Sequence, residues 1–393
     1  MTAAAREARD APPSALPDSR VTLSAIAVRD FRNIARADVP LPPAGIALVG
    51  DNGEGKTNFL EAIAYLALLR SMRGVRDRDL VRFGAPAFHL DAEALGSRAT
   101  RVAVGADRAG RKRAALDGVA AARLTDALGA VPSVCFSPAD VALVGGAPAE
   151  RRRFLDITLA LSSPRYLAAL RQYRAALVRR NAALRDAARP GERHSTVAAW
   201  EPALAEHGAV LLEERRAWVA GAAPGFSRLC AVMGERGVMA IAYASPLADS
   251  SPAPAGLAEA LAEALARGRD HDRRRGMTHA GPHRDDLAVT LDSRALRVVG
   301  SAGQQRTAAI ALRLLEAATF RDRGGAQPLL LLDDPFAELD RTRAARVLAL
   351  LEEAADHGRA QTVLCVPRAN EIPPSYTRLE RWIVTDGVLR REP

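Results

Sequence analysis

The sequence predicts an α/β domain that is interrupted by a helix-rich insertion. Short apolar strands alternate with helices near both ends of the 393-residue chain, whereas the middle shows mainly the three- and four-residue apolar spacing of helices. Near the N-terminal end, a short apolar strand leads through a glycine-rich turn into an apolar helix. Together these observations indicate one α/β lobe in two sequence halves, with a second, helical lobe between them.

Composition divides the chain into a tail and three segments. Residues 1–20 mix charges, alanines and prolines without an apolar run, so we expect a disordered tail and not a signal peptide. Residues 21–148 are expected to form the N-terminal part of lobe I, and residues 276–393 its C-terminal part. Residues 149–275 are expected to form the helical insertion, lobe II.

The expected elements follow the chain in order. Before the insertion they are a strand pair over 21–41, a buried strand over 45–50, a helix from Asn58 to Leu69 and a hairpin over 101–118. Apolar spacing within the insertion predicts two long helices that pack as a hairpin, with a break at 187–194. The expected later elements are strands over 237–245 and 286–299, a helix from 301, a strand over 328–334, a helix from Arg341 to Ala355, a strand over 361–366 and a hairpin over 381–392.

The strongest local signal is the loop GDNGEGKTN, which matches the phosphate-binding pattern G-x-x-x-x-G-K-[ST]. Its backbone N–H groups and the N-terminus of the next helix can surround a triphosphate. We expect Lys56 to reach the β and γ phosphates of ATP, and the Thr57 hydroxyl to hold Mg²⁺. The expected ATP-binding residues are Gly50, Asp51, Asn52, Gly53, Glu54, Gly55, Lys56, Thr57 and Asn58.

A P-loop also needs a carboxylate from a neighbouring strand to complete its magnesium site. The segment LLLLDDP supplies one, because Asp333 follows four leucines at the carboxyl end of a buried strand. Asp334 comes next and could orient or deprotonate the water that attacks the γ phosphate. We therefore expect Asp333 to be a Mg²⁺ ligand, and Asp334 and Lys56 to be the catalytic residues.

The segment SAGQQR begins a later helix. Ser301 and Gln304 fit a capping box, in which each side chain bonds a backbone N–H of the first turn. A capping role alone would explain these residues. However, a helix N-terminus with small residues also admits a phosphate, so the sequence leaves both roles open.

Basic residues dominate the charge of the chain. Its net charge is +9 with a pI near 10.2, which favours a polyanionic partner such as DNA. Only two of its 55 basic residues are lysines, so a compositional bias towards arginine weakens this inference and singles out Lys56. The candidate DNA contacts are Arg108, Arg111, Lys112 and Arg113 in the expected hairpin turn, although a charge run is more often a solvated face.

Other residues exclude some classes of protein. Cys135, Cys230 and Cys365 have no paired spacing, which argues against disulfide or zinc scaffolds and for a reducing compartment. No apolar run approaches the roughly 18 to 20 residues of a membrane span, so we expect a cytoplasmic protein with no membrane partner. His279 and His283 cannot share a helix face across Gly281 and Pro282, which favours a turn over a metal site.

Taken in order, these motifs resemble the ABC-type ATPase heads of the SMC-like DNA repair proteins. The carriers are FRN at 31–33, GEGKTNFLEAI, RSMR at 70–73, FSPAD at 136–140, GAPAERRRFLD at 146–156, LVRRNAAL, THAGPHRDDL, SAGQQRT and LLLLDDPFAELDRTR. The resemblance covers nearly the whole chain after residue 20. It implies an ABC-type P-loop ATPase head interrupted by a helical lobe.

The resemblance also implies a function in recombinational and gap repair. ATP would induce a homodimer that clasps double-stranded or gapped DNA, with slow, DNA-stimulated hydrolysis and loading of RecA at single-strand gaps. RecR, with RecO in the same pathway, would be the protein partners. The signature motif would meet the γ phosphate held by the other subunit, and Asp340 would lie in the D-loop at the interface. The signature residues are Ser301, Ala302, Gly303, Gln304 and Gln305.

Three departures from the family pattern concern the site. Ala302 stands where glutamine is usual, and Pro335 follows the acid pair where an apolar residue is commoner. Pro367 follows the strand over 361–366, where many heads place a γ-phosphate sensor. Two alternatives stay open: a structural clamp in which ATP binding suffices, and the ATPase subunit of a membrane transporter.

Overall fold

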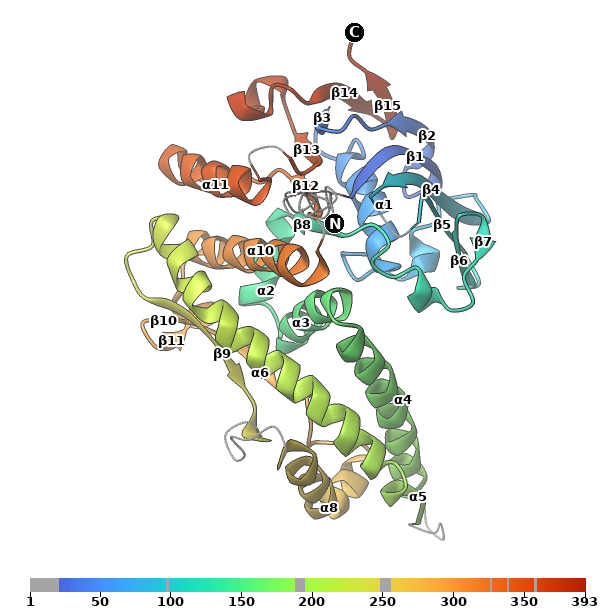
Figure 1. Ribbon diagram of the computed structural model, residues 1–393, viewed down its shortest axis with the longest axis vertical. Coiled ribbons are helices and arrows are strands. Elements are labelled where there is room, and N and C mark those ends of the chain that lie inside the picture. The colour runs from blue at the N-terminus through green and yellow to red at the C-terminus, as the bar shows by residue number, and fades with distance from the viewer. Residues whose placement is uncertain are drawn as a thin grey trace, which may run out of the picture.

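A computed structural model shows the fold (Figure 1) and describes residues 21–96, 99–187, 195–247, 256–325, 327–337, 339–356 and 359–393. The expected tail over 1–20 lies outside the described residues, as does most of the expected helix break at 187–194. The two six-stranded sheets and helix α1 gather at one end of the molecule, and long helices extend away from them.

The central element is a mostly parallel six-stranded sheet of order β15-β14-β3-β13-β12-β8. Every residue of β3, β12 and β13 is buried, as expected for parallel strands covered on both faces. The bounds are Gly45–Val49 for β3, Ser133–Phe136 for β8, Leu329–Asp333 for β12, Thr362–Val366 for β13, Glu380–Thr385 for β14 and Val388–Arg391 for β15. The strands predicted at 45–50, 328–334 and 361–366 are confirmed.

A second, antiparallel sheet has the order β2-β1-β4-β5-β6-β7. Its bounds are Thr22–Phe31 for β1, Ile34–Pro40 for β2, Ala87–Leu95 for β4, Arg101–Asp107 for β5, Lys112–Leu116 for β6 and Val119–Ala120 for β7. Helix α1, Lys56–Leu68, packs between this sheet and one face of the parallel sheet in a common apolar core. The strand pair over 21–41 and the hairpin over 101–118 are confirmed.

The opposite face of the parallel sheet is covered by helices α10 and α11, and its core continues into the long helices. The helix bounds are Ala142–Gly145 for α2, Pro148–Ser162 for α3, Pro164–Ala187 for α4, Ser195–Ala198 for α5, Glu201–Val232 for α6, Leu257–Arg275 for α8, Leu296–Val299 for α9, Ala302–Gly324 for α10 and Arg341–Ala354 for α11. Helices α4 and α6 lie side by side (Figure 1), which confirms the predicted helical hairpin. No helix among the described residues is long and apolar enough to cross a membrane.

A small third sheet, of order β11-β10-β9, lies where the chain passes between the long helices and α10. Its bounds are Met239–Ala244 for β9, Asp286–Leu291 for β10 and Arg294–Ala295 for β11. The strand expected over 286–299 is correct only in part, because Leu296–Val299 forms the short helix α9. Leu296 is buried there while Val298 and Val299 are exposed, so packing of one leucine overrides the strand propensity of the valines.

A buried ion cluster joins three of the long helices. Arg180 of α4 is fully buried and donates hydrogen bonds to Asp272 of α8 at 2.7 Å and to Glu201 of α6 at 3.1 Å. It also donates to the Thr278 hydroxyl at 2.8 Å. Removing one partner of such a cluster leaves buried charge without compensation.

We predict that Arg180→Met lowers the free energy of unfolding by about 1 to 3 kcal/mol, because Asp272 and Glu201 lose their shared buried cation and are left with His279 and Arg269 as partners. Urea denaturation followed by circular dichroism would measure this loss. Arg171→Met is the matched control, since Arg171 is an exposed arginine of the same helix. Similar unfolding midpoints for the two variants would contradict the prediction.

Candidate functional site

The P-loop joins the buried strand β3 to helix α1 through residues 50–55. Gly53 and Gly55 have φ angles of +94° and +117°, a region in which a residue with a Cβ is strained. A Cβ on Gly55 would also lie only 2.8 Å from the Asn33 side-chain oxygen. The two glycines therefore permit a tight loop that delivers the chain into the helix N-terminus.

Lys56 begins α1 and curls back over the loop. Its side chain is buried and its Nζ donates hydrogen bonds to the carbonyl oxygens of Gly50 and Asp51, the second at 2.8 Å. The same side chain lines the cavity in front of the loop. The ammonium group is thus positioned within the loop, next to the space that a phosphate would occupy.

Thr57 and Asp333 meet at the carboxyl edge of the parallel sheet. The Thr57 hydroxyl donates a hydrogen bond of 2.8 Å to Oδ1 of Asp333, the last residue of β12. Burial raises the pKa of Asp333, and the Thr57 hydrogen bond opposes this rise. A hydroxyl and a carboxylate oxygen are ligands that Mg²⁺ accepts, so the donor set fits the metal.

Asp334 turns the chain away from β12. Its φ of +46° lies in the left-handed region, and its N–H donates to the carbonyl of Cys365 at 3.0 Å. Asp334 lines the cavity of about 510 Å³ in front of the P-loop, together with Lys56, Thr57 and Asp333. The structure therefore brings both predicted catalytic residues and both predicted metal ligands to one cavity.

Three further residues line this cavity, and sequence reasoning discussed only one of them, Pro367, at the position of a γ-phosphate sensor. They are Arg73, Pro138 and Pro367. Arg73 donates to the Asn58 side-chain oxygen at 3.1 Å and lies 3.6 Å from Glu61 of α1. The motif RSMR could have pointed to Arg73, because its last residue supplies a cation close to the expected phosphates.

Two distant turns hold the P-loop from outside. The Asn33 amide, between β1 and β2, donates to the Glu54 carbonyl at 3.1 Å and accepts from Asn58 at 2.8 Å. The N–H of Gly387, in the β14–β15 turn, donates to the same Glu54 carbonyl at 2.8 Å. The loop is therefore fixed before any ligand arrives.

The predicted capping box is confirmed at the start of α10. The Ser301 hydroxyl accepts from the Gln304 N–H at 3.2 Å, and the Gln304 side chain accepts from the Ser301 N–H at 3.0 Å. Ser301 and Ala302 are exposed, and Gly303 is half-buried. None of the signature residues, 301 to 305, lines the cavity of the chain's own P-loop.

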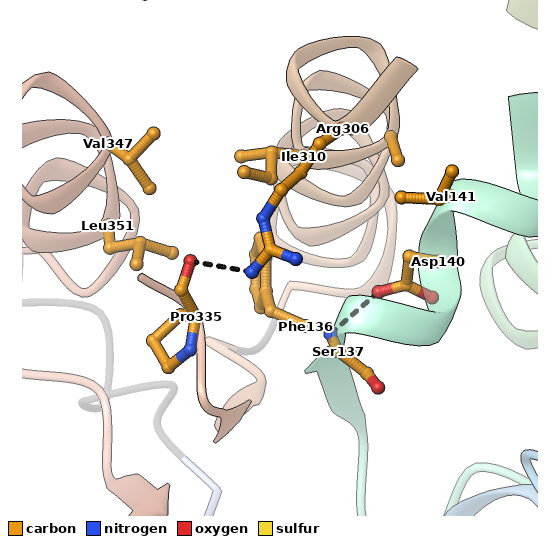
Figure 2. Close-up of a pocket in the computed structure, with 10 residues that line it drawn as sticks. Phe136, Ser137, Asp140, Val141, Arg306, Ile310, Pro335, Val347 and Leu351 are labelled. Carbon is orange, nitrogen blue, oxygen red and sulfur yellow. Dashed lines mark hydrogen bonds between the residues drawn. The ribbon is translucent and has the colours of Figure 1, made fainter. Parts of the chain in front are cut away.

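Arg306, the next residue, connects the signature helix to the segment that follows β12, and Figure 2 shows its contact with Pro335. Its buried guanidinium reaches from α10 and donates to the carbonyl oxygens of Asp334 and Pro335, at 3.2 Å each. Phe136 and Ile310 pack around it in the same pocket. Sequence reasoning missed this arginine, which ties the position of Asp334 to α10.

Asp340 begins α11, and its carboxylate accepts a hydrogen bond from the Arg343 N–H at 2.9 Å. Backbone hydrogen bonds from this helix start lower the pKa of Asp340. Its side chain is 67% exposed. Arg343 reaches back to Thr307 of α10 at 3.2 Å, so the expected D-loop residue lies near the signature helix.

The four basic residues in the β5–β6 turn and at the start of β6 have different environments. Arg111 is exposed and pairs with Asp107 at 2.6 Å, whereas Arg113 is exposed on β6. Lys112 points inward instead, where it pairs with Asp77 at 2.7 Å and lies over the Tyr65 ring. Arg108 donates to two backbone carbonyls of a neighbouring turn. The turn is thus not a uniform basic patch.

The segment with His279 and His283 forms a turn, as expected. His283 contacts the Tyr173 hydroxyl at 2.6 Å, and burial lowers its pKa to about 4. His279 pairs with Asp272 at 2.8 Å. Within the described ranges, no group of His, Cys, Asp or Glu side chains forms a metal cluster.

Fold and site together define an ABC-type ATPase head. The head domain of Smc from Pyrococcus furiosus has the same fold, with a TM-score of 0.55 at 17% identity over 95% of this chain and 96% of that one. A family model described as the RecF/RecN/SMC N terminal domain matches residues 22–372.

Closer relatives identify the family. The DNA replication and repair protein RecF of Roseiflexus castenholzii is 37% identical over 391 residues, covering 93% of this chain and 98% of that protein. RecF of Anaeromyxobacter dehalogenans is 40% identical over 342 residues, covering 84% and 89%. A structure of the recombination mediator protein RecF with ATP, in the RecFOR pathway, matches with a TM-score of 0.86 at 26% identity and covers 96% and 99%. The chain belongs to the RecF family of DNA replication and repair proteins.

We predict that Lys56→Ala weakens ATP binding at least tenfold, because the loop loses the only lysine that lines its cavity. Isothermal titration with ATP and Mg²⁺ would measure the dissociation constant. Lys112→Ala is the control, since it removes the chain's other lysine from a site that does not line the cavity. Equal losses in both variants would contradict the prediction.

Proposed function

We propose that this protein is a weak, DNA-dependent ATPase of recombinational and gap repair that acts as an ATP-induced dimeric DNA clamp. The observation that carries the proposal is the position of the signature helix. Its N-terminus is exposed, begins with small residues and does not line the cavity of its own P-loop. A helix N-terminus of this kind is suited to a phosphate held by a second subunit.

In the proposed cycle, the P-loop binds the triphosphate of ATP through its backbone N–H groups and Lys56. Thr57 and Asp333 would hold Mg²⁺, which supplies positive charge against the β and γ phosphates. Asp334 would orient the attacking water and accept its proton. Arg306 holds Asp334 by a hydrogen bond to the Asp334 backbone carbonyl. Contact of a second subunit with the signature helix would therefore act on the same segment that carries the proposed base.

Slow turnover is part of the proposal. Pro367 follows β13 and lines the cavity, and its side chain has no group that can hydrogen-bond a γ phosphate. The γ phosphate would then receive less stabilisation in the transition state, so hydrolysis would be slow and the ATP-bound state would persist. A structural clamp, in which ATP binding without turnover is the function, is the alternative that this same observation favours.

The proposed DNA partner is duplex DNA, including gapped DNA, and residues 149–275 form a second lobe of the clamp. The net charge of +9 supports contact with phosphates. RecF in the structural comparison is described within the RecFOR pathway. We extend this to partnership with RecR, with RecO in the pathway, and to loading of RecA at single-strand gaps.

Ser301→Arg is predicted to leave ATP binding by the monomer intact and to abolish ATP-induced dimerisation. A long cation at the exposed helix start would block the approach of the second subunit's phosphate, while Ser301 does not line the chain's own cavity. Light scattering with ATP would report the mass. The control is Gln172→Arg, which adds the same charge to an exposed position on α4. A Ser301→Arg dimer with normal turnover would leave the segment only its capping role.

Asp334→Asn is predicted to bind ATP and to accumulate as a dimer on duplex DNA, with its ATP turnover rate reduced roughly 10²- to 10⁴-fold. The amide keeps the shape of the carboxylate but cannot accept the proton of the attacking water. Steady-state ATPase assays and gel shifts with duplex DNA would measure both effects. Asp322→Asn, at an exposed position on α10, is the control. The structural-clamp alternative is favoured instead if wild-type protein shows no DNA-stimulated turnover.

A further inference from the structure

One aromatic side chain stands apart from the rest of the surface. Phe83 is 95% exposed, and the other large exposed hydrophobic residues among the described ranges are all non-aromatic. Isolated exposed apolar residues are common and by themselves indicate nothing. The backbone that carries Phe83, however, is held by several hydrogen bonds.

Phe83 is the second residue of a tight turn that runs from Arg82 to Ala85. The Ala85 N–H donates to the Arg82 carbonyl at 3.0 Å, and Gly84 supplies a positive φ of +83° at the third position. Arg108 comes from the β5–β6 turn and donates to both ends: Nε to Ala85 at 2.7 Å and Nη2 to Arg82 at 2.8 Å. One guanidinium therefore fixes the turn that presents the ring to solvent.

The turn is anchored at its entrance as well. The Arg82 N–H donates to the Asp30 carbonyl at 2.8 Å, at the end of β1. Val81, just before it, forms a bridge with Phe31, and both of these side chains are buried. On a mobile loop the ring would sample many positions. Because hydrogen bonds hold this turn, the ring stays exposed at one position.

The surroundings of the ring are basic. The segment 70–83 contains five arginines and two aspartates, and Asp77 is held by Lys112. Exposed arginines in this segment are Arg73, Arg76, Arg78 and Arg82; of these, Arg78 lies 3.7 Å from Asp79 and Arg82 lies 3.8 Å from Asp30. Such a charge distribution attracts polyanions, among them the phosphates of nucleic acid.

A groove of about 680 Å³ starts beside the same turn. Its lining includes Asp30 and Ala87, which adjoin the turn, and it crosses the outer face of the antiparallel sheet over small residues such as Gly105. Arg29, Arg111 and Arg113 also line it, together with Asp107; Arg111 pairs with Asp107, and Arg29 pairs with Asp38. A groove with arginines along it can bind a nucleic-acid strand. That strand would continue from a base that stacks on the Phe83 ring.

We propose that Phe83 stacks on the terminal base at the border of a gap, where duplex DNA passes into single strand. An end of a duplex offers an uncovered base face, which a continuous duplex does not, and an aromatic ring covers such a face without reading its sequence. Phe83 would thus give the clamp its preference for gap borders. This inference rests on the proposed DNA clamp and names the DNA feature that the clamp recognises.

The test compares two DNAs of equal length, one continuous and one gapped, with 2-aminopurine at the gap border. Binding is measured by fluorescence anisotropy at one fixed salt concentration, with full-length protein and a slowly hydrolysed ATP analogue. Wild-type protein is expected to prefer the gapped DNA and to quench 2-aminopurine. Phe83→Ala is expected to weaken binding to gapped DNA about tenfold, the order of one stacked base, without weakening binding to continuous DNA. Phe83→Trp should restore both signals.

The control is Val119→Ala, which shortens an exposed apolar side chain on β7 of the nearby antiparallel sheet. Equal losses of Phe83→Ala on the two DNAs would overturn the inference, and so would unchanged affinity for both. Wild-type protein that binds neither DNA in the ATP state would overturn the proposed clamp itself, and this inference with it.

Discussion

The hydrogen bond between Thr57 and Asp333 is the contact on which the site depends. It joins the first turn of α1 to the end of β12, residues that lie 276 positions apart in the chain. The bond is possible because β13 separates β3 and β12 and all three strands run parallel, so their carboxyl ends meet at one edge. In open parallel sheets this edge is where ligands bind. Any displacement of β12 would therefore separate the phosphate loop from its carboxylates.

A second connection runs from this edge to the signature helix. Arg306 holds the backbone of Asp334 and Pro335 from α10, and Arg343 of α11 reaches back to Thr307 of the same helix. Two arginines thus fix the acid pair, the expected D-loop and the signature helix relative to one another. A second subunit that contacts Ser301 would act on a helix already bonded to the segment with the proposed base. Nucleotide binding and dimerisation can be coupled through these few contacts.

Much of the parallel sheet could be predicted, because its strands carry local signals. The strand before the P-loop and the LLLLDD strand are short apolar runs with polar ends, and the glycine pattern fixes the loop between strand and helix. Strands β4 and β8 were not predicted. Strand β8 has four residues and no alternation, and its place beside β12 comes only from long-range pairing.

The individual arginines were harder to predict. In a chain with 55 basic residues, composition cannot distinguish Arg73 at the phosphate cavity or Arg306 behind the acid pair from solvated arginines. Their roles follow from which segments the fold brings together. A local charge run can also mislead. Lys112 belongs to such a run, yet its side chain points inward and pairs with Asp77.

The central claim is that the signature helix of a second head completes the ATP-binding site of the first. Analytical ultracentrifugation of the wild-type protein tests it most directly, with ATP, ADP or a slowly hydrolysed ATP analogue, each with and without duplex DNA. The account predicts monomers with ADP, dimers with ATP or the analogue, and cosedimentation of the dimer with DNA. Equal monomer fractions with and without ATP would contradict it.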